Sequence, residues 1–418
     1  MKVLWFSNGI LSKDSSKGSG SWLHAMRDLL SPEIELVNIT KGTSNVIERH
    51  NCNGITEYIL PSWKLKNGVP SADNINRIEE IINVEKPDLI HIWGVEQYWA
   101  LLFSRGYITY KNVLLEIQGV VSSCVSVFWG ELTPNEINNC KSFREVFFSR
   151  KEGSLQWYYR DFLKGGKREK EIIGTFRIIA TQSDWTRDQI LPYLNEKALV
   201  LRSLRPLREA FILSNKWNQC DKTSLKIFTS TSYYLPFKGI HILLKAVSIL
   251  KTKHPEVILE IAGPNLYAIP WYKQNGYQHL LLRMIEELGI KNNISFCGRL
   301  DANGLINKLL NSDVFVNPSF VESYSASMAE ALCLGVPCVC SYAGAMPEFS
   351  KSNGVALYYS PCDYCSCAAK ILSIITDKER AISLSRNAIE RMEELCNPQA
   401  VLNRQLETYH SVLNNEFD

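Results

Sequence analysis

Short apolar segments alternate with helical segments along this chain of 418 residues, and that alternation restricts its fold more than any other feature. Residues 88–94 (DLIHIWG) and 313–319 (DVFVNPS) are apolar almost throughout, as are parallel strands whose sheet is covered by helices on both faces. Residues 76–85 and 239–254 instead carry apolar side chains at helical spacing. The pattern predicts an α/β protein with parallel sheets, whose strands are 2–7, 34–39, 88–94, 112–119, 176–183, 198–203, 224–232, 257–263, 293–298, 313–319, 336–342 and 355–360.

Chain length and a break in this alternation predict two domains. One hydrophobic core stops growing at ~250–300 residues, and the periodicity is lost near residues 205–224. We expect an N-terminal Rossmann-like domain over 1–205 and a second over 206–395. Residues 396–418 read as a C-terminal helix that could pack back on the first domain.

Composition excludes several classes of protein. The hydrophobic fraction of 45% and the charged fraction of 21% are those of an ordinary globular protein. The net charge of +3 is small, and its positive excess lies in the first half of the chain, which argues against a general nucleic-acid-binding protein. No apolar run reaches transmembrane length and the N-terminus is unlike a signal peptide. We therefore expect a cytoplasmic protein.

The cysteines do not predict a disulfide framework. Most of the twelve lie within apolar segments, where a thiol acts as a small hydrophobic group. Cys362, Cys365 and Cys367 form half of a metal-site pattern, but no second Cys or His pair follows at zinc spacing. A reduced, metal-free cluster is the interpretation that this spacing favours.

Two carboxylates in residues 315–348 carry the strongest functional signal. Glu322 and Glu330 are separated by seven residues among small and apolar side chains. A helix that starts between them would present unpaired N–H groups to a diphosphate. We expect both carboxylates to line one pocket, one accepting hydrogen bonds from sugar hydroxyls and the other from a ribose. The alternative is a pair of ordinary surface glutamates on a helix.

The surroundings of this pair resemble a known family. The order of strand, Pro-Ser, Glu322, small residues, Glu330-Ala, Gly-Val-Pro and Ala-Gly is similar to the E-x7-E element of the retaining glycosyltransferases of family 4, including bacterial capsular and exopolysaccharide-type members. The resemblance implies the GT-B fold, with two Rossmann-like domains facing across a cleft. It also implies transfer of a hexose-type sugar from a nucleotide-diphosphate sugar to a saccharide or lipid-linked saccharide, in surface polysaccharide biosynthesis.

The resemblance assigns roles to residues of the second domain. Lys238, in a Lys-Gly pair, corresponds to the lysine that stabilises the donor phosphates, and Glu322 would orient the donor sugar. The other donor-binding candidates are Arg299, Tyr324, Ser325, Ala326 and Glu330. No Asp-x-Asp motif occurs, so we expect no metal and no cofactor besides the nucleotide-sugar substrate.

The chain departs from the family pattern at two places. Ser232 and Tyr233 stand where the family carries a phosphate-binding arginine, and the replacement charge could come from Arg202, Arg205 or Arg299. Ser325 stands where the family often has glycine.

The first domain offers weaker candidates. Gly18 and Gly20 form a glycine-rich turn of the kind that reaches toward the donor in this family, although a plain flexible loop fits equally well. The turn is not G-x-G-x-x-G, so nicotinamide binding is disfavoured. Gln118 and Asp184, at predicted strand ends, are acceptor-side candidates. His91 is either a polar group at a strand end or a core histidine.

Residues 147–171 combine seven Lys or Arg, four acidic and six aromatic residues. This mixture could contact the inner membrane face, or form a helix whose aromatic rings pack inward. Two other functions stay open: a nucleotide-sugar epimerase of the same fold and a catalytically silent sugar-nucleotide-binding protein.

Overall fold

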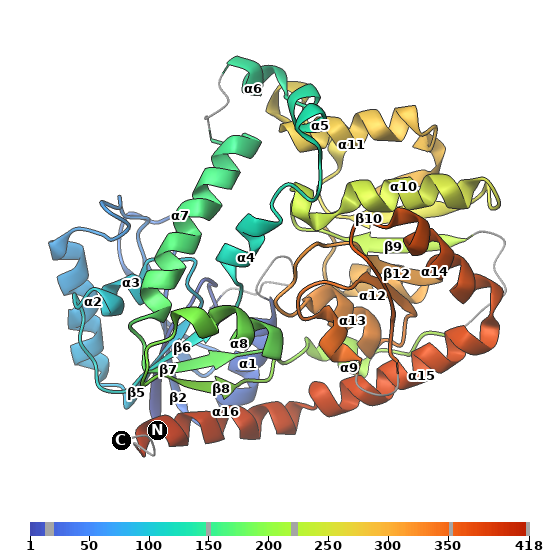
Figure 1. The fold of residues 1–418 in the computed structure, drawn as a ribbon. Coiled ribbons are helices and arrows are strands. Elements are labelled where there is room, and N and C mark those ends of the chain that lie inside the picture. Colours follow the sequence, from blue (N-terminus) through green and yellow to red (C-terminus); the bar gives the residue numbers. More distant parts are fainter. Residues whose placement is uncertain (13–20, 148–151, 219–224, 351–353, 415–418) are drawn as a thin grey trace.

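A computed structural model describes residues 1–12, 21–147, 152–218, 225–350 and 354–414 and places two sheets beside each other (Figure 1). Gly18 and Gly20 fall outside the described residues. The first sheet has the order β3-β4-β2-β1-β5-β6-β7-β8, and all its neighbouring strands are parallel except β3 and β4. Its strands are β1 (Lys2–Phe6), β2 (Glu35–Lys41), β3 (Glu48–Cys52), β4 (Ile55–Leu60), β5 (Leu89–Trp93), β6 (Val113–Ile117), β7 (Ile178–Thr181) and β8 (Leu199–Arg202).

The β3–β4 hairpin is an addition to the predicted strands. β3 lies at the edge of the sheet and its five residues are only partly buried, so its sequence, ERHNC, carries no apolar run. β4 continues the sheet beside β2 in parallel register from Leu36–Ile55 to Lys41–Leu60. Charged residues on an edge strand hinder pairing with a second molecule, which is a common reason for such a composition.

The second sheet is parallel throughout and has the order β11-β10-β9-β12-β13-β14. Its order reverses between β9 and β12, the kind of position where α/β sheets bind ligands. Its strands are β9 (Lys226–Ser230), β10 (Ile258–Ala262), β11 (Ile294–Gly298), β12 (Val314–Asn317), β13 (Cys338–Ser341) and β14 (Leu357–Tyr359). The prediction of an α/β chain with parallel sheets is thus confirmed.

Helices cover the sheets and connect them. Those of the first half are α1 (Ser21–Leu30), α2 (Ala72–Glu85), α3 (Trp99–Ser104), α4 (Val121–Ser126), α5 (Pro134–Asn139), α6 (Phe143–Phe147), α7 (Leu155–Ile173), α8 (Asp184–Ile190) and α9 (Glu209–Leu213). Those of the second half are α10 (Ile240–Lys251), α11 (Gly276–Glu287), α12 (Ala302–Leu310), α13 (Ala326–Cys333), α14 (Tyr364–Thr376), α15 (Lys378–Leu395) and α16 (Pro398–Leu413). Short 3-10 helices are η1 (Leu191–Tyr193), η2 (Pro236–Lys238), η3 (Leu266–Ala268), η4 (Trp271–Lys273), η5 (Lys291–Asn293) and η6 (Met346–Phe349).

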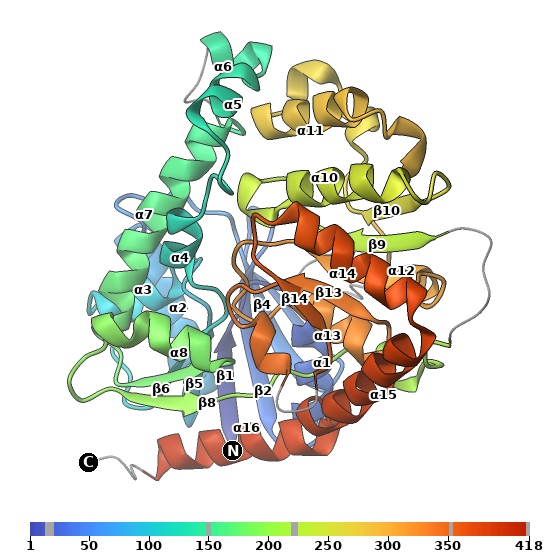
Figure 2. The ribbon, with the colours of Figure 1, turned by 45° about the vertical axis from the view of Figure 1, so that its right-hand side comes forward.

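Two segments cross between the halves of the molecule. α5 and α6 belong to the first half of the chain, but α5 lies against α11 and α6 against η4, both in the second half (Figures 1 and 2). Phe128 and Leu132 accordingly share a hydrophobic cluster with residues of the second sheet. In the other direction, α16 runs beneath the first sheet, where Trp5 Nε1 donates a hydrogen bond of 3.0 Å to the Tyr409 hydroxyl.

His91 lies within this first core. Its ring is fully buried, contacts the ring of Trp93 and has Nδ1 2.9 Å from the Tyr409 hydroxyl. Burial lowers its pKa, against the opposing influence of Glu116. Of the two interpretations of His91, the structure therefore favours a histidine buried in the core.

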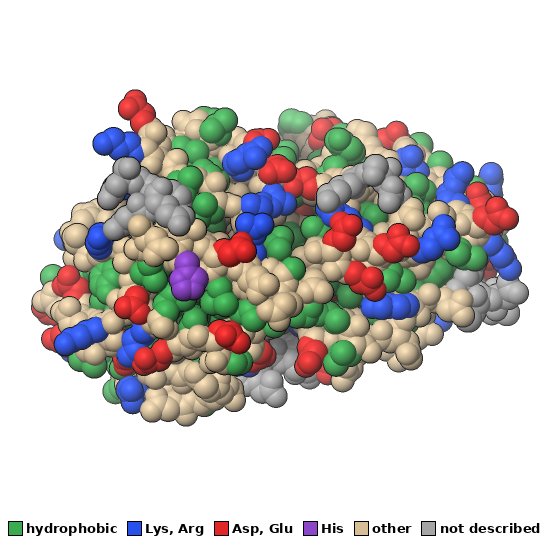
Figure 3. Space-filling model, turned by 90° about the horizontal axis from the view of Figure 1, so that it is seen from below, with side chains coloured by type: hydrophobic (Ala, Val, Ile, Leu, Met, Phe, Trp, Pro, Cys, Tyr) green, Lys and Arg blue, Asp and Glu red, His purple; other side chains and the backbone are tan. Residues whose placement is uncertain are grey.

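Seen from below, the molecule carries Lys and Arg side chains among Asp and Glu side chains, with no continuous basic area in view (Figure 3).

Candidate active site

A cleft of about 670 Å³ lies where the two sheets face each other. Its walls are formed by loops that follow β1, β5 and β6, by α4 and α7, and by loops at the ends of β9 and β12 in the second half. Such loops at the carboxyl ends of parallel strands are the usual ligand-binding surface of α/β sheets. The lining residues are Asn8, Gly9, Trp22, Leu23, Val95, Glu96, Gln118, Gly119, Val120, Val121, Cys124, Asp161, Phe162, Gly165, Arg168, Arg205, Tyr233, Phe237, Lys238, Val321, Glu322, Ser323, Tyr324, Ser325 and Ala326.

Lys238 and Glu322 form an ion pair in this cleft. Lys238 Nζ lies 2.7 Å from Glu322 Oε1, and each side chain is 18% exposed. Burial lowers the pKa of Lys238, but the Glu322 carboxylate, with smaller contributions from Tyr233 and Cys124, opposes this, and the pKa lies above its ordinary value. Lys238 is therefore a permanent cation, and the pair leaves its remaining N–H groups for an anionic ligand.

Glycines hold the backbone on both sides of this pair. Gly239 follows Lys238 with φ +69°, and a Cβ atom there would collide with the carbonyl oxygen of Pro318. Gly344 has φ +58°, and a Cβ atom there would collide with the backbone of Glu322, whose carbonyl accepts a 2.7 Å hydrogen bond from Ala345 N. The positions of both charged groups thus depend on close backbone contacts that only glycine permits.

Ser325 starts α13 in an unusual backbone conformation. Its φ of +66° and ψ of +77° lie in the left-handed region, which favours glycine. Its hydroxyl accepts a hydrogen bond from Met328 N at 3.4 Å and another from Asn317 Nδ2 at 2.8 Å. The serine therefore acts as the N-cap of α13, so that the start of the helix at Ala326, and Tyr324 and Ser325 before it, line the cleft.

Three arginines were candidates to replace the phosphate-binding arginine of the family. Of these, Arg205 is the one that lines the cleft. Its guanidinium lies 4.2 Å over the ring of Trp22 and 5.1 Å from the ring of Tyr324. Its buried Nε has no hydrogen-bond partner among the residues that the structure describes. Burial lowers the pKa of Arg205 to about 10, against the opposing influence of Tyr324, Glu116 and Glu96, so the group stays charged at neutral pH.

The other two candidate arginines lie elsewhere. Arg299 is exposed on the turn after β11 and does not line the cleft. Arg202 forms ion pairs with Asp184 and Glu348, outside the cleft lining.

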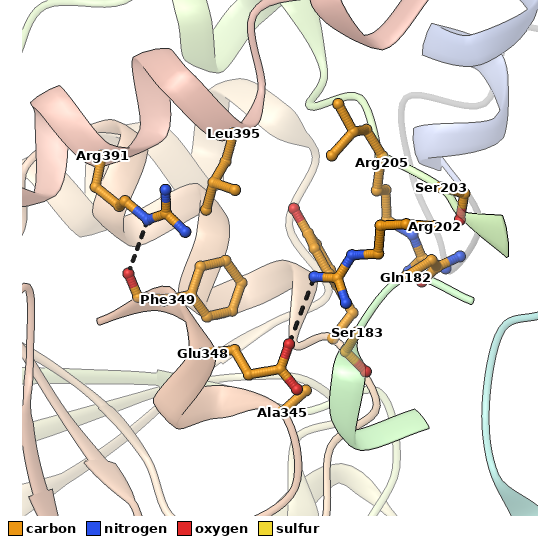
Figure 4. Close-up of a pocket in the computed structure, with 12 residues that line it drawn as sticks. Gln182, Ser183, Arg202, Ser203, Arg205, Ala345, Glu348, Phe349, Arg391 and Leu395 are labelled. Carbon is orange, nitrogen blue, oxygen red and sulfur yellow. Dashed lines mark hydrogen bonds and ion pairs between the residues drawn. The ribbon is translucent and has the colours of Figure 1, made fainter. Parts of the chain in front are cut away.

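A smaller pocket on the other side of Arg205 contains Arg202 and Glu348 (Figure 4). Arg202 lies 3.4 Å from Glu348 and 3.3 Å from Asp184. Glu348 also accepts hydrogen bonds from the backbone N–H groups of Asp184 and Trp185, at 2.9 and 2.6 Å, across the junction of the two halves. Asp184 therefore lies at this junction and not among the residues that line the larger cleft.

Glu330 is placed on α13 away from the cleft lining. It forms an ion pair with Arg208, whose Nη2 lies 2.6 Å from Glu330 Oε1. Burial raises the pKa of Glu330, although Arg208 opposes this effect. Glu322 and Glu330 thus have separate basic partners, Lys238 and Arg208.

Gln118 lines the wall of the cleft that the first half of the chain forms. Glu96, which the sequence analysis did not identify, lines the same wall. Glu96 follows β5 and its carboxylate lies within contact distance of Gly94 and Gly119. A single glutamate after an apolar strand has no motif around it. Its position at the carboxyl end of β5 was the only available signal.

Within residues 147–171, several aromatic rings pack inward. Tyr159 and Phe162 lie 5.3 and 5.7 Å from the ring of Phe128, and Phe162 lies 5.7 Å from Phe237. Lys164 and Lys167 are exposed on α7. Membrane contact through this segment stays a prediction.

Within the described ranges, no helix is both long and apolar enough to span a membrane, and no group of three His, Cys, Asp or Glu side chains is arranged to hold a metal ion.

The second half of the chain is similar to a known family. Residues 215–391 match the family model described as glycosyl transferases group 1. Glycogen synthase of Mycobacterium tuberculosis is 28% identical over 155 residues, which are 37% of this chain and 35% of that protein. The chain thus spans about a third to a half of the length of the curated relatives that it matches.

Solved structures resemble the chain over nearly its whole length. Sucrose-phosphate synthase from Thermosynechococcus elongatus has a TM-score of 0.73 at 14% identity and covers 99% of both chains. The Anabaena protein HepE in complex with UDP-glucose has a TM-score of 0.65 at 13% identity, over 98% of this chain and 100% of that one. At these identities the likeness concerns the fold, which is the GT-B fold expected from the sequence.

Proposed function

We propose that this protein is a retaining glycosyltransferase that moves a hexose-type sugar from a nucleotide-diphosphate sugar to a hydroxyl of a saccharide or lipid-linked saccharide, in surface polysaccharide biosynthesis. The observation that carries this proposal is the Lys238–Glu322 ion pair beside the N-terminus of α13, in the cleft between the two sheets. The match of residues 215–391 to glycosyl transferases group 1 supports it.

The cleft provides positive charge where a leaving diphosphate needs it. Lys238, Arg205 and the N–H groups of the first turn of α13 line the same space. Preorganised cations and helix N-termini stabilise developing negative charge without reorganisation. Arg205 would replace the arginine that the family carries before Lys238, because it lines the cleft and its buried Nε has no partner in the described part of the chain.

In this mechanism the acceptor hydroxyl attacks the anomeric carbon from the face of the leaving group. The new bond joins the anomeric carbon to the acceptor oxygen as the bond to the phosphate oxygen breaks. The departing phosphate oxygen takes the acceptor proton, so the enzyme needs no base for this step. Glu322 would accept hydrogen bonds from donor-sugar hydroxyls and keep Lys238 in place.

The test is a thermal-stabilisation screen of UDP-, GDP- and ADP-sugars, beginning with UDP-glucose because the HepE structure contains it. A ligand present at 100 times its Kd should add ~2.7 kcal/mol of stability. The donor that binds is then incubated with saccharide acceptors, and the anomeric configuration of the product is read by NMR. Inversion of configuration would contradict the retaining mechanism.

Two outcomes would assign a different function. Conversion of the donor sugar into its epimer without an acceptor would identify an epimerase. Binding without turnover by any acceptor or by water would identify a silent binding protein.

A further inference from the structure

The Glu96 carboxylate occupies a space between two strand ends that glycines keep open. Gly94 follows β5 with φ +92°, and a Cβ atom there would collide with Glu96 Oε2. A Cβ atom on Gly119, which follows the adjacent parallel strand β6, would lie 3.5 Å from Glu96 Oε1. The carboxylate therefore lies along two backbone segments at the carboxyl edge of the first sheet, beside Gln118.

Glu96 has no side-chain partner within the described part of the chain. Its charge is influenced by Glu169 of α7 and by Arg205, neither of which forms an ion pair with it. Although the side chain is open to the solvent of the cleft, desolvation by the surrounding protein raises the pKa of Glu96 to about 7. Backbone N–H groups of Glu96 and Val95 and the charge of Arg205 oppose this rise, while Glu169 adds to it.

The loop that carries Gly119 leads directly to the donor side of the cleft. Val120 N donates a hydrogen bond of 3.2 Å to Ser323 Oγ, and Ser323 is the neighbour of Glu322. Glu96 thus lies on the first-half side of the contact between the two walls. Under the proposed function, an acceptor that attacks a sugar held by Glu322 would enter the cleft along this wall.

Charge on the cleft wall indicates the class of acceptor. Lys238 and Arg205 lie where the proposed donor diphosphate would neutralise them. Among the described residues, the other charged groups of the lining are Glu96, Asp161, Arg168 and Glu322, the last of which is paired with Lys238. Arg168 extends toward Gly68, where its Nη1 would lie 3.9 Å from an added Cβ. Above about pH 7, where Glu96 is ionised, the described part of the wall beside Gln118 is therefore acidic, and it would repel a phosphate or a carboxylate on the acceptor.

We propose that Glu96 binds the acceptor by accepting a hydrogen bond from a hydroxyl next to the one that attacks, and that the acceptor sugar in this subsite is neutral. This inference rests on the proposed function. A carboxylate offers two oxygens that can accept hydrogen bonds from neighbouring hydroxyls of one sugar ring, and such charge-assisted bonds are the stronger kind.

The test compares wild type with Glu96→Gln, with Glu80→Gln on the exposed face of α2 as the control. Acceptors are a panel of neutral methyl hexosides together with their uronic acid and 6-phosphate counterparts, and hydrolysis of the donor by water is measured in parallel. Wild type should use a neutral member and reject its anionic counterparts. Glu96→Gln should raise the acceptor KM at least tenfold while donor affinity and donor hydrolysis stay within twofold, and Glu80→Gln should match wild type.

The pH profile separates a direct role of Glu96 from a structural one. Below about pH 7 the protonated carboxyl loses hydrogen-bond acceptor capacity, so the wild-type acceptor KM should rise as the pH falls. In Glu96→Gln the acceptor KM should be flat over the same range. Glu169, Asp161, Arg168, Arg205 and the Lys238–Glu322 pair remain in both proteins and cancel in the comparison.

Failure of this inference can be told apart from failure of the proposed function. If donor hydrolysis occurs but no neutral hexoside is used, or if Glu96→Gln keeps the wild-type acceptor KM, the assignment of Glu96 is wrong and the transferase proposal stands. If no nucleotide sugar binds or turns over at all, both are wrong.

Discussion

Lys238 Nζ and Glu322 Oε1 lie 2.7 Å apart although 84 positions separate the two residues in the chain. The pair joins the 3-10 helix after β9 to the loop after β12, the two strands between which the order of the second sheet reverses. Each side chain therefore fixes the other before a substrate binds.

Removal of either partner should slow sugar transfer. We expect Glu322→Gln and Lys238→Ala each to lower turnover at least about tenfold, which corresponds to ~1.4 kcal/mol in the barrier. The physical reason is that both groups would contact parts of the donor whose charge or position changes in the transition state. Lys308→Ala is the matched control, because Lys308 forms a similar ion pair with Glu260 outside the cleft. Turnover within twofold of wild type in both cleft variants would refute the site.

Chelation should leave activity largely unchanged. The chain has no Asp-x-Asp motif, and Lys238, Arg205 and the α13 N-terminus can carry the phosphate charge. The measurement is the initial transfer rate after treatment with EDTA, compared with an untreated sample. Complete loss of the rate, restored by Mg²⁺ or Mn²⁺, would reveal a metal requirement.

The left-handed backbone of Ser325 predicts an order of stabilities. Ser325→Gly and Ser325→Ala both remove the hydroxyl that caps α13, but only alanine keeps the Cβ atom that makes φ +66° unfavourable. We expect the glycine variant to be more stable than the alanine variant by ~1 kcal/mol, as measured by urea unfolding.

Ser373 provides the control for this comparison. It lies within α14, where glycine should be less stable than alanine by ~0.5–1 kcal/mol. The order of stability of the glycine and alanine variants should therefore be opposite at positions 325 and 373. The same order at both positions would contradict the explanation given for Ser325.

His241 should make stability fall at mildly acidic pH. Its Nε2 lies 3.0 Å from the carbonyl of Gly130 and its Nδ1 lies 2.8 Å from the Tyr277 hydroxyl. Burial lowers the pKa of His241 to about 4, from 6.5 in the unfolded chain. Between pH 6.5 and 4, His241 binds a proton in the unfolded state but not in the folded state, so the free energy of unfolding decreases as the pH falls from 6.5 toward 4.

This dependence can be measured by urea unfolding at pH 7 and pH 5. Wild type should lose roughly 1–2 kcal/mol more between these values than His241→Gln does. His410→Gln, which changes an exposed histidine, should keep the wild-type dependence. An unchanged pH dependence in His241→Gln would show that other groups cause the loss.

Sequence patterns gave most of the fold and the principal cleft residues, for reasons that are local. Apolar runs such as 88–94 and 313–319 identify buried parallel strands because both faces of such strands are covered. Lys238, Glu322 and Ser325 stood out because each lies in a short segment that combines a strand end, small residues and a helix start. The polar edge strand β3 was missed because its partial burial requires no apolar run.

Tertiary packing decided which of the candidates share a cleft. Arg202, Arg205 and Arg299 were equivalent as residues near strand ends, but only Arg205 lies in the cleft, stacked on Trp22 from another segment. Glu96 had no pattern of its own, and its position depends on the contact between the ends of β5 and β6. The sequence alone determined where strands and helices form, because their periodicities arise from neighbouring residues. Only the folded chain determined which charges meet, because those contacts join residues that are far apart in sequence.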